Sequence, residues 1–170
     1  MDGGVGFLSL YTEILLGTVA FMAIIATLRQ TFGEPLTQYQ YLIARFFVDM
    51  GLLNICILLF NLALFSIISD ADLVWTITLR SIFVVGLCYL LYYVRRRFSI
   101  RAPRSLPAAL VILGYLVVYG AMGVALLQPN LWDYKDFTII YFCWAFTSLV
   151  IVFMVFMGSF INIQLGGEAE

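Results

Sequence analysis

Long apolar runs fill most of this chain, and short polar segments separate them. The five runs cover residues 7–28, 46–68, 73–94, 106–127 and 137–161. Each holds about 20 residues or more, and a helix of that length crosses the ~30 Å hydrocarbon core of a bilayer at about 1.5 Å per residue. The pattern predicts an all-α integral membrane protein, in which residues 1–170 form a single domain, a bundle of five transmembrane helices.

Polar residues just before the runs indicate where the helices begin. The segment Thr37-Gln38-Tyr39-Gln40 fits a capping box, so the second helix is expected to begin near Gln38, well before its apolar run. The segment Ser69-Asp70-Ala71-Asp72 marks the start of the third helix in the same way. Ser105, with Pro107 in the first turn, marks the start of the fourth.

The composition agrees with a chain that lies almost wholly inside a membrane. It is 64% hydrophobic and 11% charged, whereas soluble domains carry about 25% charged residues. Any site must therefore lie between helices or on short connections. Cys56, Cys88 and Cys143 all fall within the apolar runs, where we expect small, buried, inert thiols rather than disulfides.

The chain contains no histidine, which narrows the possible chemistry. This excludes His-ligated haem, the usual zinc sites and any Ser-His or Cys-His nucleophile. No Gly-rich phosphate loop is present either. We therefore expect no metal, no cofactor, no nucleic-acid binding and no enzymatic activity. A membrane-embedded enzyme acting on lipid is the least favoured class, because the acidic residues are scattered at different depths.

Charge in the connections predicts how the chain is threaded. The connection after the third run is rich in arginine and holds no acid, whereas acidic residues dominate the connections after the second and fourth runs. The arginines are Arg95, Arg96, Arg97, Arg101 and Arg104. The positive-inside rule places this connection in the cytoplasm, with the N-terminus outside and the C-terminus inside, in a plasma membrane or a bacterial inner membrane.

The same five arginines could also bind a ligand. We favour a topogenic role, in which the arginines hold the connection in the cytoplasm, because it explains the charge without any partner. The alternative is contact with anionic lipid headgroups or with an acidic partner, because each arginine near a negative surface contributes about 1 kcal/mol.

Two charged residues lie inside apolar runs. From the outer ends of their runs, Glu13 is expected ~9 Å deep and Arg80 ~10 Å deep. Each lone charge at such depth costs ~2.5–3.5 kcal/mol on insertion scales, and a partner is the usual compensation. We predict an intramembrane ion pair between Glu13 and Arg80. The alternative for Arg80 is a side chain that extends to the outer interface.

Glu13 also begins a stripe of mostly small residues in the first run. The stripe is spaced by four, three, four and three residues and consists of Glu13, Gly17, Ala20, Ile24 and Thr27. Small residues at helical spacing let another helix approach closely. This face is therefore expected to contact protein rather than lipid.

The second run carries the most polar residues. Asp49 follows Arg45 by one turn, so the two can neutralise each other, while Asn54 and Asn61 are seven residues apart and share a helix face. We interpret Asp49, Asn54 and Asn61 as a polar seam between helices, in which the asparagines hydrogen-bond across the interface. A polar pathway is the alternative, but Asp49 and Asn54 are about 140° apart around the helix and form no continuous lining.

The residues favour a non-catalytic, multi-pass membrane protein that works by association. It would act as a homo-oligomer or as a membrane subunit of a larger complex, with the bilayer, anionic headgroups and other membrane subunits as partners. The alternative is an oligomeric channel or transporter for a proton, an ion or a small solute. In that case Glu13, Asn54 and Asn61 would provide the polar groups along the path.

Overall fold

The computed structural model describes residues 3–32, 36–100, 105–128 and 133–166, and it describes side-chain surroundings over residues 5–28, 36–100, 105–128 and 133–158. The chain forms five helices, each long and apolar enough to cross a membrane. They are α1 (Gly3–Phe32), α2 (Gln38–Ile67), α3 (Ala71–Ser99), α4 (Leu106–Leu127) and α5 (Tyr134–Gly166). The prediction of an all-α bundle of five helices, each long and apolar enough to span a membrane, is confirmed.

The helix starts follow the capping signals in the sequence. At the start of α2, the Thr37 hydroxyl accepts the Gln40 N–H at 3.2 Å, and the Gln40 side chain accepts the Thr37 N–H at 3.1 Å. Asp70 caps α3 by accepting the N–H groups of the second and third helical residues. Ser105 occupies the N-cap of α4, but its side chain makes no capping hydrogen bond. Its hydroxyl lies 3.4 Å from the Tyr39 hydroxyl instead.

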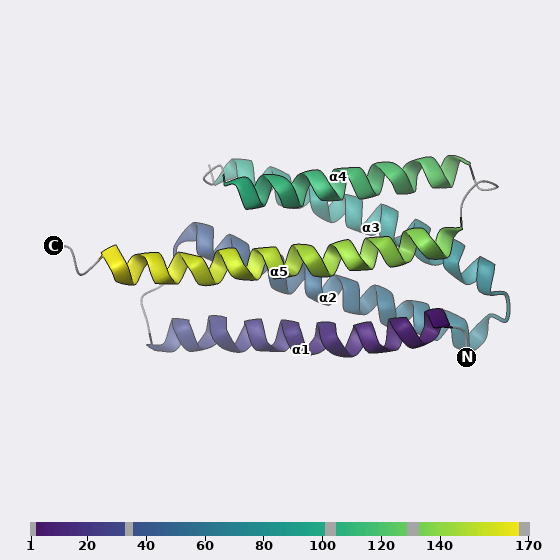
Figure 1. The fold of residues 1–170 in the computed structure, drawn as a ribbon, viewed down its shortest axis with the longest axis horizontal. Helices are drawn as coiled ribbons and strands as arrows, with labels where there is room; N and C mark the ends of the chain where they lie inside the picture. Colours follow the sequence, from purple (N-terminus) through teal and green to yellow (C-terminus); the bar gives the residue numbers. More distant parts are fainter. Residues whose placement is uncertain (1–2, 33–35, 101–104, 129–132, 167–170) are drawn as a thin grey trace.

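Successive helices run antiparallel, so α1, α3 and α5 all run in one direction (Figure 1). The start of α1 and the end of α5 therefore lie at opposite ends of the bundle. Helix α5 contacts each of the other four helices. Helix α1 packs mainly against α2 and makes a smaller contact with α5. Within the described residues, no Cα atom of α1 comes within 8 Å of α3 or α4. We call the end where α3 terminates, with Arg95, Arg96 and Arg97, the arginine end.

Aromatic side chains and small residues build the interior. Tyr115, Tyr141, Phe142 and Phe156 are fully or almost fully buried around the central helix α5. Close helix contacts depend on glycine: a Cβ added at Gly86 of α3 would collide with the Tyr119 hydroxyl. The absence of a side chain at Gly86 leaves room for the hydroxyl end of the Tyr119 ring against α3.

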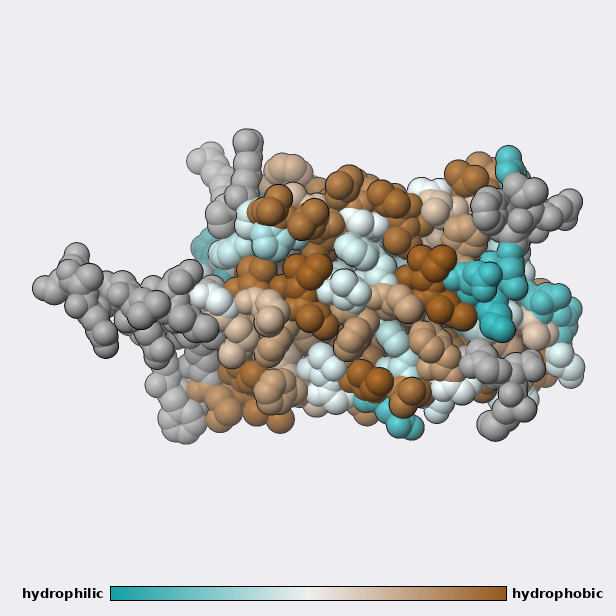
Figure 2. Space-filling model, viewed as in Figure 1, coloured by the Kyte–Doolittle hydropathy of each residue, from teal (hydrophilic) through white to brown (hydrophobic). Residues whose placement is uncertain are grey.

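The outer surface is apolar on all five helices, as Figure 2 shows for one face. Exposed large side chains include Leu16 of α1, Val84 of α3 and Met154 of α5. Cys56, Cys88 and Cys143 are also exposed, so the expectation that they are buried is wrong. In a membrane protein an apolar side chain is as stable facing lipid as it is in the protein interior. Hydrophobicity alone therefore does not indicate burial.

Candidate functional site

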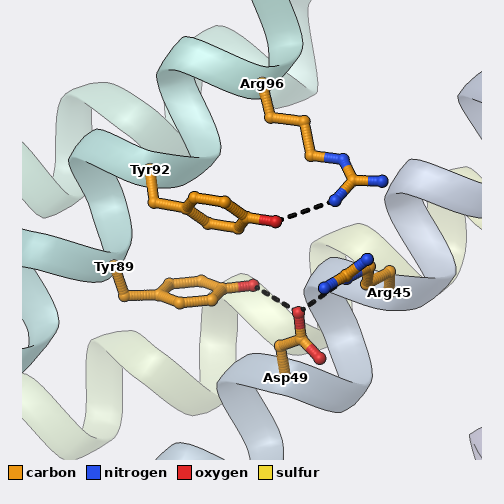
Figure 3. Close-up of polar contacts among 5 residues, drawn as sticks. All are labelled: Arg45, Asp49, Tyr89, Tyr92 and Arg96. Carbon is orange, nitrogen blue, oxygen red and sulfur yellow. Dashed lines mark hydrogen bonds and ion pairs between the residues drawn. The ribbon is translucent and has the colours of Figure 1, made fainter.

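A polar cluster joins α2 to α3 near the arginine end (Figure 3). Arg45 Nε lies 3.1 Å from Asp49 Oδ2, which confirms the neutralisation expected from their spacing, and the Tyr89 hydroxyl reaches the same oxygen at 3.5 Å. On the neighbouring turn, Arg96 Nη1 donates to the Tyr92 hydroxyl at 2.8 Å. Both members of the ion pair are about one-third exposed, at 39% and 33%, so the cluster lies at the surface of the bundle rather than in its interior.

The asparagines of α2 lie in the interior but do not bridge helices. Asn54 and Asn61 are both fully buried. Asn54 Nδ2 donates to the Met50 carbonyl of its own helix at 2.8 Å. Asn54 Oδ1 and both polar atoms of the Asn61 side chain have no hydrogen-bond partner among the described residues.

The predicted seam is therefore corrected in two ways. Asp49 is engaged by Arg45 near the bundle end and does not belong with the asparagines. Asn54 forms no hydrogen bond across helices within the described residues: its Nδ2 donates to the carbonyl one turn back on its own helix, and its Oδ1 has no partner there. The asparagines remain a pair of buried, under-satisfied amides on one face of α2.

Tyrosines, rather than asparagines, make the deep polar contacts between helices. The Tyr115 hydroxyl of α4 lies 2.8 Å from Ser148 Oγ of α5, and both groups are buried. The Tyr11 hydroxyl of α1 donates to the Phe142 carbonyl of α5 at 2.7 Å. The sequence indicates that mid-helix hydroxyls need partners at this depth, but it does not identify Ser148 or a backbone carbonyl as those partners.

Glu13 and Arg80 do not meet within one chain. Both side chains are exposed, and they lie on α1 and α3, which are not in contact. Within the described residues the ion pair formed is Arg45–Asp49. The predicted intramembrane pair is thus not an internal contact. The prediction assumed that equal depth on two parallel helices brings the side chains together, but depth does not determine which helices are neighbours, and α2 contacts both α1 and α3.

The small-residue stripe of α1 also faces outward. Glu13, Gly17, Ala20 and Ile24 are all exposed, and a Cβ added at Gly17 would meet no atom within 4 Å. Thr27 is exposed too. Among the described residues, no helix of the same chain covers the stripe. Helix α1 buries the opposite face, with Leu15 and Met22, against the bundle.

The arginines of the third connection have different surroundings. Arg95 is exposed, Arg96 is bound to Tyr92, and the Arg97 guanidinium lies 5.8 Å from the centre of the Tyr39 ring. Arg101 and Arg104 lie outside the described residues. In the part of the chain that the structure describes, no three Cys, Asp or Glu side chains form a group that could hold a metal ion.

Comparison with models of known protein families, with curated proteins and with solved structures finds no match.

Proposed function

We propose that this multi-pass membrane protein works by association, as a homo-oligomer or as a membrane subunit of a larger complex, without catalysis. The observation that carries this proposal is a pair of lone charges on the outside of the bundle. Glu13 and Arg80 are exposed within the candidate spans Val5–Leu28 and Ala71–Ser99. A charge that faces lipid costs ~2.5–3.5 kcal/mol on insertion scales, so a protein surface that covers it is strongly favoured.

A second copy of the chain satisfies both charges at once. Helices α1 and α3 run in the same direction, and Glu13 and Arg80 lie about 15 Å and 14 Å from the first residues of these helices, at about 1.5 Å per residue. Packing the outer face of α1 from one copy on the outer face of α3 from the next would bring opposite charges together. Different surfaces meet in such a contact, so it is head-to-tail, and its repetition gives a ring where the rotation closes.

The outward stripe of α1 supports the same contact. Gly17 and Ala20 lie one and two turns after Glu13 on an exposed face, and nothing fills the space above Gly17. Helix interfaces in membranes are rich in small residues, because the backbones can then approach closely and gain dispersion energy. A charge beside such a stripe is more consistent with a helix partner than with lipid.

The proposal includes an orientation. The arginine end lies in the cytoplasm and the start of α1 lies outside, in a plasma membrane or a bacterial inner membrane. The support is the asymmetry of charge: Arg95, Arg96 and Arg97 lie at one end of the bundle, whereas Asp72 and Asp136 lie at the start of α3 and α5 at the other end.

Subunit counting tests this function. Fluorescently tagged chains are reconstituted in lipid vesicles, and photobleaching steps are counted for the wild type, Glu13→Gln and Arg80→Met. We expect a defined oligomer for the wild type and mostly monomers for each variant. Asp136→Asn, which removes an exposed charge from the end of the bundle, is the control and should leave the count unchanged. A monomeric wild type would exclude the homo-oligomer, and unchanged counts in both variants would exclude this contact.

One observation favours a second function, an oligomeric channel or transporter for a proton, an ion or a small solute. Asn54 Oδ1 and the Asn61 amide are buried without a partner, and water or a permeating solute could supply the missing hydrogen bonds. Glu13 lies outside the single bundle, so it could contribute only at an interface between copies. Solute flux into vesicles that is abolished by Asn61→Leu, with folding intact, would establish this alternative.

A further inference from the structure

A pocket opens near the arginine end of the bundle, between the ends of α2, α3 and α4 and the side of α5. The empty space between its walls is about 350 Å³, and this figure includes space that is open to the surroundings. The first two turns of α2 and α4, the last two turns of α3 and the middle third of α5 contribute its walls. The pocket therefore lies where the bundle meets the membrane interface, and it extends inward from there.

The pocket is polar on one side and apolar on the other. Tyr39, Arg97 and Ser105 lie at the helix ends, whereas Ile43, Val111 and Val155 lie further along their helices and line the inner part. None of the described residues that line the pocket is acidic. A ligand that matches these walls carries a negative group beside an apolar segment.

The polar side is organised by contacts between helices. The Arg97 guanidinium of α3 lies over the Tyr39 ring of α2, 5.8 Å from its centre, and the Tyr39 hydroxyl lies 3.4 Å from Ser105 Oγ. Ser105 makes no cap hydrogen bond to its own helix, so its hydroxyl is directed to this contact. Guanidinium and hydroxyl groups together form a donor set suited to a phosphate, because arginine can present two parallel N–H groups.

We propose that this pocket binds one anionic phospholipid, with the phosphate at Arg97, Tyr39 and Ser105 and the upper part of an acyl chain along Ile43, Val111 and Val155. The membrane itself supplies this ligand at the right depth, because the pocket mouth lies at the helix ends. The proposal differs from a general attraction of arginines to a charged surface, since it assigns one arginine and one apolar cavity to the same lipid.

Adjacent residues provide matched controls for both parts of the site. Arg96 precedes Arg97 on the same last turn, but its guanidinium is bound to Tyr92 outside the pocket. Replacing either arginine by glutamine removes the same charge from the same helix end. On α4, Ala108 lines the pocket whereas Ala109 is exposed on the outer face. Replacing either alanine by phenylalanine adds the same ring.

The experiment measures lipid preference directly. The full chain is reconstituted in phosphatidylcholine bilayers, and electron spin resonance gives the association of spin-labelled phosphatidylglycerol relative to spin-labelled phosphatidylcholine. Wild type and the Arg96→Gln chain should both prefer the anionic lipid. Arg97→Gln should lower the preference about fivefold, the effect of one arginine at a negative surface. Ala108→Phe should abolish it although every charge remains, and Ala109→Phe should leave it unchanged.

Several results would overturn the proposal. Equal losses in Arg96→Gln and Arg97→Gln would mean diffuse attraction by the whole arginine end. An unchanged preference in Ala108→Phe would show that no chain enters the cavity. Displacement of the labelled lipid by inorganic phosphate would mean a site for a free anion. If Arg97→Gln does not fold, as judged by circular dichroism, Ala108→Phe and Arg97→Lys still test the site, and Arg97→Lys should retain part of the preference.

Discussion

Replacing Asn61 by leucine should stabilise the bundle, although the sequence alone suggests the opposite. Asn61 is fully buried in α2, and neither polar atom of its side chain has a hydrogen-bond partner in the described structure. A buried polar group without a partner costs about 1–3 kcal/mol. Leucine is similar in size and has no such group, so it removes the cost while it keeps the contacts.

The expected gain is smaller than the full penalty. Polar groups in membrane helices also find partners in the unfolded state within the membrane, and measured side-chain contributions there average only ~0.6 kcal/mol. We therefore expect Asn61→Leu to raise the free energy of unfolding by about 1 kcal/mol. Asn54→Leu removes one unpaired oxygen but also one hydrogen bond to the Met50 carbonyl, so its effect should lie close to zero.

Reversible unfolding in mixed lipid–detergent micelles measures both changes against the wild type. Thr78→Val provides the control: Thr78 is fully buried, but its hydroxyl already donates to the Val74 carbonyl. It should give no gain. If Asn61→Leu destabilises the bundle instead, the amide must have a partner, either water or another copy of the chain. That result would refute the reasoning, and a water partner would favour the polar pathway.

Three further predictions concern threading, packing and the polar cluster. Cysteines placed at Ser99 and Lys135 in a chain without its native cysteines should be labelled from opposite sides of the membrane, Ser99 from the cytoplasm; labelling of both from one side would exclude the five-span threading. Gly86→Ala should lower the free energy of unfolding by about 1–3 kcal/mol, because its Cβ collides with the Tyr119 hydroxyl. Tyr119→Phe in the same chain should recover much of that loss in the same unfolding assay, and no recovery would mean that the collision is not the cause. Asp49→Asn should change stability by about 1 kcal/mol or less, because its ion pair is partly exposed, and a larger loss would mean that the cluster is structurally essential.

The helices could be predicted from the sequence because each one satisfies local rules. Five apolar runs of sufficient length predict the number of helices. The capping box at Thr37 and Gln40 predicts the early start of α2. The Arg45–Asp49 contact was predictable for the same reason, since residues four apart on a helix are always neighbours.

Contacts between helices could not be predicted in the same way. Depth along the chain suggested a pair between Glu13 and Arg80, but only the packing shows that α1 and α3 are not neighbours. Cys143 illustrates a second difficulty. Both lipid and protein interior are apolar, so the sequence of a membrane helix carries a weak signal of which face points inward. The pocket was missed because its walls come from four helices whose lining residues are far apart in the sequence.

The central claim is that copies of this chain associate through the outer faces of α1 and α3. In a head-to-tail contact, Glu13→Gln and Arg80→Met each leave every interface incomplete. A mixture of the two variants restores one complete interface, because the first retains Arg80 and the second retains Glu13.

The deciding measurement is energy transfer between donor-labelled Glu13→Gln chains and acceptor-labelled Arg80→Met chains in vesicles. The account predicts little transfer within either variant alone. In the mixture it predicts clear energy transfer, and the complexes that form should be dimers and no larger. The association constant of the mixture should be about tenfold or more above that of either variant, because a hydrogen bond to a charged group contributes about 1.5–3 kcal/mol. Transfer in the mixture no greater than in the separate variants would contradict the account.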